Sequence, residues 1–148
     1  MSGAVRVVLY TNVFVSAAIN TGAPHAIVQN WLQGADFEAV VCPRLLTEIT
    51  TVLLDRPKLR RWIDLDAARR YVDTVRERAA LVADPGEVSP LTRDRADDYL
   101  IALAREHGAD FVVSGDKDLV EWSEQRPPVI APAAFLEMLG YETADIDS

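Results

Sequence analysis

The sequence predicts an α/β protein in which helices cover both faces of a mainly parallel sheet. Two observations support this fold class. Short apolar runs that suit buried strands alternate with amphipathic helical segments along the chain. The 148 residues are 49% apolar and 26% charged, which is enough apolar material for one domain with a sizeable core and argues against disorder.

In the first half of the chain, two short β-branched runs predict buried strands and three amphipathic segments predict helices. The strands are expected over 5–10, before a polar turn at Thr11 and Asn12, and over 37–42. The helices are expected over 13–19, from Pro24 to about Gln33, and from Pro43 to about Leu53. Proline suits the first turn of the two longer helices because an N–H has no helical partner there.

In the second half, Pro57 interrupts the third helix and Gly108 closes a later one. Helices are expected around 59–62, over 66–78, from about Asp94 to His107, over 119–122 and over 132–139. Strands are expected over 111–113 and 129–130, while 81–83 is either a short strand or an extended link. Residues 1–140 then form a single domain, and 141–148 an acidic, flexible tail.

Composition excludes several classes of protein. No apolar stretch approaches the roughly 20 residues that span a bilayer, and no signal-peptide core follows the N-terminus. We therefore expect a cytoplasmic protein without a membrane partner. Cys42 is the only cysteine, and the two histidines lack ligand-like spacing, so an intrachain disulfide and a cysteine-based zinc site are excluded.

The charge is unevenly distributed. A net charge of −8 argues against general binding to phosphates. However, 8 of the 15 basic residues lie between Arg56 and Arg78. This segment is either a solvated helical surface with intrahelical ion pairs or a positive shoulder beside an acidic centre, and charge alone does not choose between them.

Candidate functional residues follow the expected strands, because ligands of an open parallel sheet bind beyond the carboxyl ends of its strands. Those ends are Tyr10 to Asn12, Cys42 to Pro43, and Ser114 to Asp118. The last end carries two carboxylates, Asp116 and Asp118, although turn formation alone also accounts for aspartate in such a loop.

Two helices add further carboxylates. Asp94, Asp97 and Asp98 share the N-terminal face of one helix, where capping and the helix dipole also explain them. Glu48 flanks the buried stripe of another helix. A carboxylate in that position is costly to desolvate unless it is paired or binds a metal, although its long side chain could also reach solvent.

A cluster of Glu48, Asp97 and Asp116, with Asp118 nearby, would need a cation, because neighbouring carboxylates otherwise raise one another's pKa values. Without cysteine ligands or a histidine pair, the expected cation is Mg2+ or Mn2+. Such a site can generate hydroxide and hydrolyse phosphodiesters.

Four short motifs resemble, in their order and spacing, those of the PIN-domain ribonucleases. They are Val7-Val8-Leu9-x-Thr11-Asn12-Val13, Leu46-Thr47-Glu48-Ile49, Arg93-Asp94-x-x-Asp97-Asp98-Tyr99-Leu100 and Val113-Ser114-Gly115-Asp116-Lys117-Asp118-Leu119. The similarity runs from Arg6 to about Leu139 and is greatest with the VapC-type toxins of bacterial toxin–antitoxin pairs. It implies a three-layer α/β/α sandwich and a metal-dependent endoribonuclease, usually homodimeric and inhibited by a cognate antitoxin protein.

The resemblance also implies roles for individual residues. The ligands of Mg2+ or Mn2+ would be Glu48, Asp97 and Asp116, assisted by Asp118 or Asp94. Thr11 and Ser114 would lie beside the site as hydrogen-bonding residues, and Asn12 would hold the turn that shapes it. Asp98 and Lys117 would shape the site or face the substrate.

The chain departs from the family at the end of the first strand, where the family's first acid falls on Tyr10. A phenol with a pKa of about 10 carries no charge at neutral pH, and it is a poor ligand for Mg2+. Its ring also occupies space where a metal or phosphate would lie. We therefore expect a folded chain with weakened or lost nuclease activity, unless Asp94, Asp98 or Asp118 completes a single-metal site.

Two alternatives remain open. One is a non-catalytic PIN-fold module that binds RNA or an antitoxin-like partner; unlike an enzyme, it would bind regardless of Mn2+ or chelator. The more distant one is a receiver-type phosphoacceptor, which also places carboxylates at strand ends near a lysine such as Lys117. That fold needs its phosphoacceptor aspartate at the end of a central strand.

Overall fold

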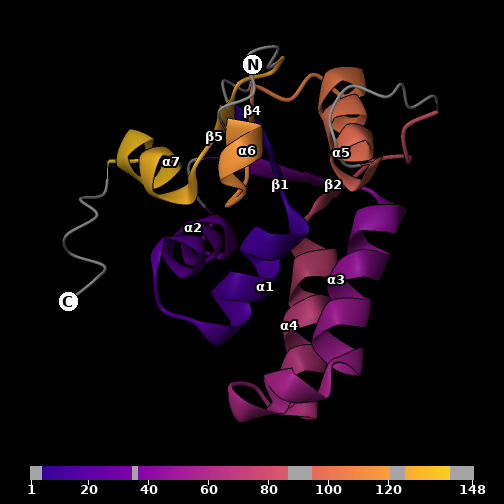
Figure 1. Cartoon of the computed structure of the whole chain (residues 1–148), viewed down its shortest axis with the longest axis vertical. Helices are drawn as coiled ribbons and strands as arrows, with labels where there is room; N and C mark the ends of the chain where they lie inside the picture. The colour runs from indigo at the N-terminus through magenta and orange to yellow at the C-terminus, as the bar shows by residue number, and fades with distance from the viewer. Residues whose placement is uncertain (1–4, 35–36, 87–94, 121–125, 141–148) are drawn as a thin grey trace.

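The computed structural model describes residues 5–34, 37–86, 95–120 and 126–140 (Figure 1). The described residues form a five-stranded sheet in which every pairing is parallel. Its strands are β1 (Val5–Leu9), β2 (Phe37–Val41), β3 (Ala80–Leu81), β4 (Phe111–Val113) and β5 (Val129–Ile130). The predicted α/β class with a parallel sheet is confirmed.

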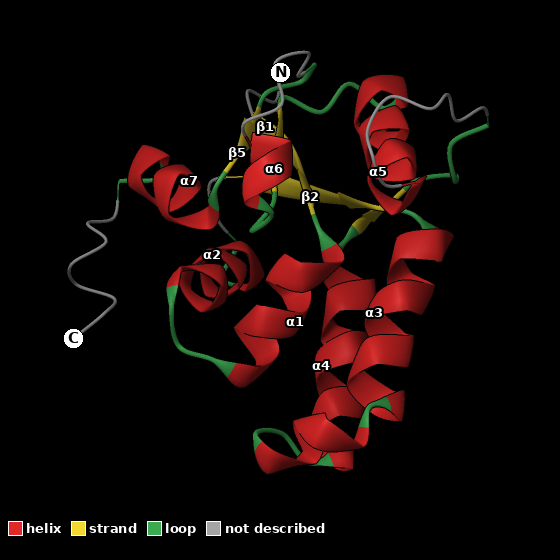
Figure 2. Cartoon of the chain, viewed as in Figure 1, coloured by secondary structure: helices red, strands yellow, loops and turns green. Residues whose placement is uncertain are grey.

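Helices cover both faces of this sheet, which gives the expected three layers. They are α1 (Thr11–Ile19), α2 (Ala23–Leu32), α3 (Pro43–Asp55), the 3-10 helix η1 (Pro57–Arg61), α4 (Leu65–Arg78), α5 (Arg95–Glu106), α6 (Lys117–Val120) and α7 (Pro132–Met138). α2 packs against α1, α7 and β2, whereas α5 packs against β1 and β4. Figure 2 shows the strands between these two groups of helices. None of the described helices is long and apolar enough to cross a membrane.

The strand order is β3-β2-β1-β4-β5, with β1 at the centre. Receiver-type domains have the flavodoxin-like order 2-1-3-4-5. The observed order therefore excludes the receiver-type alternative.

Several expected boundaries differ from the structure. The first strand ends at Leu9 and not at residue 10, because Tyr10 is the N-cap of α1. Thr11 and Asn12 form the first helical turn of α1 rather than a separate turn, because the Tyr10 carbonyl already accepts hydrogen bonds from the N–H groups of Val13 (3.0 Å) and Phe14 (3.3 Å). Similarly, α6 begins at Lys117 because the N–H of Val120 bonds to the carbonyl of Asp116. Cys42 precedes α3 as its N-cap and is not part of the second strand.

The centre of the core positions the functional end of the sheet. Val7, Val8 and Leu9 of β1 are fully buried, as expected for a parallel strand covered on both faces. Leu9 pairs with Val113 of β4, and the Tyr10 N–H extends this pairing to the Val113 carbonyl at 3.0 Å. The carboxyl ends of β1 and β4 therefore meet. The expected tail, 141–148, lies outside the described residues.

The buried face of α3 provides a test of the packing. Leu53 of α3 is fully buried, whereas Leu81 of β3 is 53% exposed. We expect Leu53→Ala to lower the free energy of unfolding by about 2–5 kcal/mol because it leaves a cavity. Leu81→Ala, the matched control, should change it by about 0.5 kcal/mol or less. Urea denaturation measures both, and similar losses in the two variants would contradict this packing.

Candidate functional site

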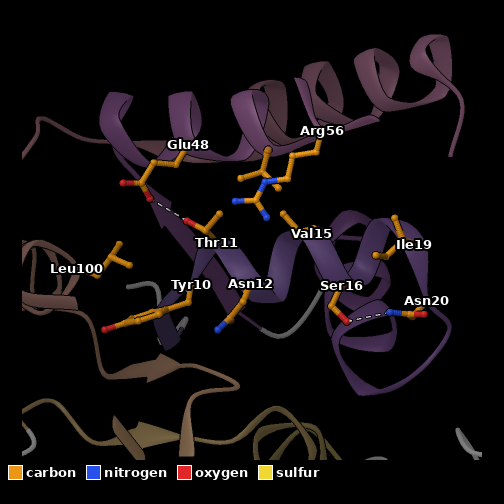
Figure 3. A pocket seen from close by; sticks show the side chains of 11 residues that line it. Tyr10, Thr11, Asn12, Val15, Ser16, Ile19, Asn20, Glu48, Arg56 and Leu100 are labelled. Carbon is orange, nitrogen blue, oxygen red and sulfur yellow. Dashed lines mark hydrogen bonds between the residues drawn. The ribbon is translucent and has the colours of Figure 1, made fainter. Parts of the chain in front are cut away.

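A cavity of about 420 Å³ opens beside the carboxyl end of β1 (Figure 3). Its walls come from α1 and the residue before it, from α3 and from α5. Tyr10 and Glu48 lie at one end of the cavity, and Ile19 and Asn20 lie at the other. Residues that are far apart in the sequence therefore meet where a parallel sheet binds its ligands.

The carboxylate of Glu48 is held by three neighbours. Its Oε2 accepts hydrogen bonds from the Thr11 hydroxyl at 3.0 Å and from the Tyr99 hydroxyl at 2.8 Å. Nε of Arg44, one helical turn earlier, lies 3.8 Å from Oε1. The Arg44 guanidinium also stacks over the Tyr99 ring, 3.9 Å from its centroid. Glu48 thus satisfies the expectation that a carboxylate flanking the core is paired, and its partners are these three side chains.

Tyr99 is a site residue that the sequence analysis missed. Burial raises the pKa of its hydroxyl far above the ordinary value, and the hydrogen bond to Glu48 and the charge of Glu48 raise it further. Tyr99 therefore remains a protonated donor at neutral pH. Two signals could have identified the network: a phenol beside the buried stripe of its helix needs a polar partner, and Arg44 precedes Glu48 by four residues.

Tyr10 lies at the junction between β1 and α1. It occupies the N-cap position of α1, where its side chain makes no capping hydrogen bond, and it is only 4% exposed. The side chain contributes to the wall of the cavity shown in Figure 3 without bringing a negative charge.

A second cavity, of about 290 Å³, lies on the other side of the first turn of α1. Asn12 and Ser16 line both cavities, and Asp116 lines the second. Oδ1 of Asn12 accepts a hydrogen bond from the N–H of Gly115 at 3.5 Å, and the hydroxyl of buried Ser114 accepts one from the N–H of Asp116 at 3.0 Å. Asn12 therefore contacts the loop that carries Asp116.

The remaining candidate residues are only partly placed. Asp98 is buried in α5, and Lys117 is exposed at the start of α6. Asp94 lies outside the described residues, as do the side chains of Asp97 and Asp118.

The described acidic side chains do not fit a divalent cation by themselves. Among the described residues, no three histidine, cysteine, aspartate or glutamate side chains form a group that could hold a metal. Glu48 lines the first of the two cavities, and Asp116 lines the second. In addition, Glu48 is already balanced by two hydroxyl donors and Arg44. The described residues thus form a polar site at the expected place without a complete set of metal ligands.

A double-mutant cycle tests the Glu48 network. Glu48→Ala leaves the Tyr99 hydroxyl without its acceptor and should destabilise the fold by about 1–3 kcal/mol. In the Tyr99→Phe background the same change should cost less, with a coupling energy of about 0.5–3 kcal/mol. Glu38→Ala is a control at a half-buried glutamate of β2, which forms an ion pair with Arg6 at 3.8 Å. Additive effects of the two substitutions in urea denaturation would show that the hydrogen bond is not formed.

The raised pKa of the Cys42 thiol predicts how the free energy of unfolding depends on pH. Burial raises the pKa of this thiol from 9.0 to about 11, with a further contribution from Asp84. Because the folded state favours the protonated thiol, its contribution to stability is complete below pH 9 and is lost as the pH rises towards 11. The free energy of unfolding should therefore fall more steeply over this range in the unmodified chain than in Cys42→Ala. Equal slopes would contradict the assignment.

Comparison with known proteins identifies the family. The sequence matches the PIN domain family over residues 6–118. It is 31% identical over 124 residues to the uncharacterized protein MJ1680 of Methanocaldococcus jannaschii, across 82% of this chain and 77% of that protein.

Two solved structures share the fold. PAE2754 from Pyrobaculum aerophilum aligns with a TM-score of 0.65 and 17% identity, over 95% of this chain and 94% of that chain. VapBC2 from Rickettsia felis was solved with a DNA fragment from its promoter. It aligns with a TM-score of 0.59 and 11% identity, over 85% of this chain and 98% of that chain. The family match covers most of the chain and agrees with the fold, so this chain belongs to the PIN domain family.

Proposed function

We propose that this chain is a VapC-type PIN ribonuclease whose hydrolytic site is weakened by Tyr10. The observation that carries the proposal is the position of Tyr10, buried at the carboxyl end of the central strand and beside Glu48 in one cavity. The family resemblance expects an acid at this position. Removing one essential group from a catalytic site lowers rates by factors on the order of 10³ or more.

The activity that remains would require Mg2+ or Mn2+. The ligands that we propose are Glu48, Asp97 and Asp116, with Asp118 or Asp94 assisting. Thr11 and Ser114 would lie beside the site as hydrogen-bonding residues, and Asn12 would hold the loop after β4 by accepting the hydrogen bond from the Gly115 N–H. Asp98 and Lys117 would shape the site or face the substrate. We assign no catalytic step to the cation, because the described side chains alone do not complete its site.

The proposed substrate is RNA, and the proposed protein partners are a cognate antitoxin and a second copy of this chain in a homodimer. The fold shared with VapBC2 supports the toxin–antitoxin assignment. We propose a cytoplasmic location, where cellular RNA is accessible.

A second candidate, a non-catalytic module that binds RNA or an antitoxin, is favoured by the pairing of Glu48. Because Thr11, Tyr99 and Arg44 already compensate this carboxylate, the site is stable without a cation. The same pocket would then hold a ligand without hydrolysing it.

The Tyr10→Asp variant tests both candidates. We expect it to cleave a mixed RNA substrate in Mn2+ about 10³-fold faster than the unmodified chain, because it restores a negatively charged oxygen ligand at the end of β1. EDTA should abolish the cleavage. Tyr10→Asn is the matched control, since asparagine has almost the same shape as aspartate but carries no charge.

Each other outcome has a defined meaning, provided that circular dichroism shows all three proteins folded. Equal cleavage by the unmodified chain and Tyr10→Asp would show that the carboxylate at position 10 is dispensable. Cleavage by Tyr10→Asn at the rate of Tyr10→Asp would assign the inhibition to the ring and not to the missing charge. No cleavage by any variant would reject the weakened enzyme and favour the binding module.

A further inference from the structure

The far end of the α3–α4 pair carries an exposed aromatic residue among cations. We call Lys58, Arg61 and Trp62 the α3–α4 tip. Trp62 is 55% exposed, and the Arg61 guanidinium lies 5.3 Å from the centroid of its ring. Lys58 and Arg61 are exposed as well. In Figure 1 the tip lies at the end of α3 and α4 that is remote from the sheet.

The tip lies in the basic part of an acidic chain. Residues from Arg56 to Arg78 include eight basic and four acidic side chains, a net charge of +4 within a chain of −8. Within the described residues, the ion pair of this segment joins Arg76 to Asp73 at 3.1 Å, and no ion pair involves Lys58 or Arg61. An intrahelical ion pair thus accounts for only one of the eight basic side chains in this segment, Arg76. The charges of the tip are available to an anionic ligand.

Arg60, between the tip residues, has a structural role. Its Nη2 donates to the carbonyl of Leu53, one of the last carbonyls of α3 that lack a helical partner. Its Nε and Nη1 are buried. Arg60 therefore holds η1 against the end of α3 and fixes the direction in which its neighbours point.

One side of α3 connects the tip to the cavity shown in Figure 3. Glu48 and Val52 of α3 and Arg56, its C-cap residue, recur every four residues, so they follow one side of α3 over about 12 Å. All three border the cavity that contains Tyr10 and Thr11. Figure 3 shows the Arg56 guanidinium directed into this cavity. Because Arg56 immediately precedes η1, a chain-like ligand leaving the cavity along α3 reaches the tip.

We propose that the α3–α4 tip binds single-stranded RNA beyond the segment that enters the cavity. Phosphates lie on Arg56, Lys58 and Arg61, and an unpaired base stacks on the exposed part of the Trp62 ring. Single-stranded RNA suits these groups because its bases are free to stack on aromatic side chains and guanidinium planes while its phosphates meet cations. The inference depends on the proposed function only for the class of ligand.

This proposal is tested by measuring how tightly the chain binds a labelled random-sequence RNA of 12 nucleotides. Fluorescence anisotropy of the label, measured in EDTA, gives the Kd. We expect Trp62→Ala to raise the Kd at least about fivefold, because stacking of one base contributes at least that factor. Trp62→Phe, which keeps an aromatic face, should restore most of the affinity. Unlabelled RNA should also quench tryptophan fluorescence in the unmodified chain more than in Trp62→Phe.

The charge of the tip is tested with a matched pair of reversals. Arg61→Glu should weaken binding and reduce the dependence of log Kd on log salt concentration by about one unit. Arg70→Glu makes the same charge change on the exposed face of α4, opposite buried Ala68 and Val72, and should have a smaller effect.

The proposal is overturned if the unmodified chain does not bind the RNA, or if Trp62→Ala leaves the Kd unchanged in a protein that melts normally. It is also overturned if sedimentation shows that Trp62→Ala alters oligomeric state while RNA affinity is constant, since Trp62 then contacts a second copy. Because EDTA prevents metal-dependent cleavage, the binding test is independent of the nuclease test. If RNA binding does not depend on Trp62 but Tyr10→Asp cleaves RNA, only the proposal about the tip is rejected. If RNA binding depends on Trp62 but no variant cleaves RNA, only the proposal of an enzyme is rejected.

Discussion

The pairing of β1 with β4 is the constraint on which the site depends. β1 is buried at the centre of the parallel sheet, and the chain passes from its carboxyl end directly into α1. The bond between the Tyr10 N–H and the Val113 carbonyl brings that junction beside the loop from Ser114 to Asp116. Everything proposed about chemistry depends on this convergence, since the residues involved are about a hundred positions apart.

The Glu48 carboxylate shows how the fold accommodates a charge at the edge of its core. Its partners come from α1, α3 and α5, three elements that only the folded sheet brings together. Hydroxyl donors and a guanidinium stabilise a carboxylate in a medium of low polarity by the same electrostatics that a cation would use. This pairing makes the Glu48 carboxylate compatible with an uncharged neighbour such as Tyr10 in the same cavity.

α3 links two surfaces of different character. Its buried face, with Leu45, Ile49 and Leu53, is part of the core, while Glu48, Val52 and Arg56 border the cavity. At its C-terminus, Pro57 prevents the helix from continuing and Arg60 binds one of its unpaired carbonyls. The turn so formed places Lys58, Arg61 and Trp62 at the end of the α3–α4 pair that is remote from the sheet.

The sequence by itself determined the elements and their class, because strand and helix periodicity, Pro43 at a helix start and Gly108 beyond a helix end are local signals. It also placed Glu48 among groups that need a partner. It did not determine the order β3-β2-β1-β4-β5, the start of α1 at Thr11, or the partners of Glu48 in Thr11 and Tyr99, which lie 37 and 51 positions away. These features follow from which strands pair and how the helices then pack, and periodicity along the chain carries no information about either.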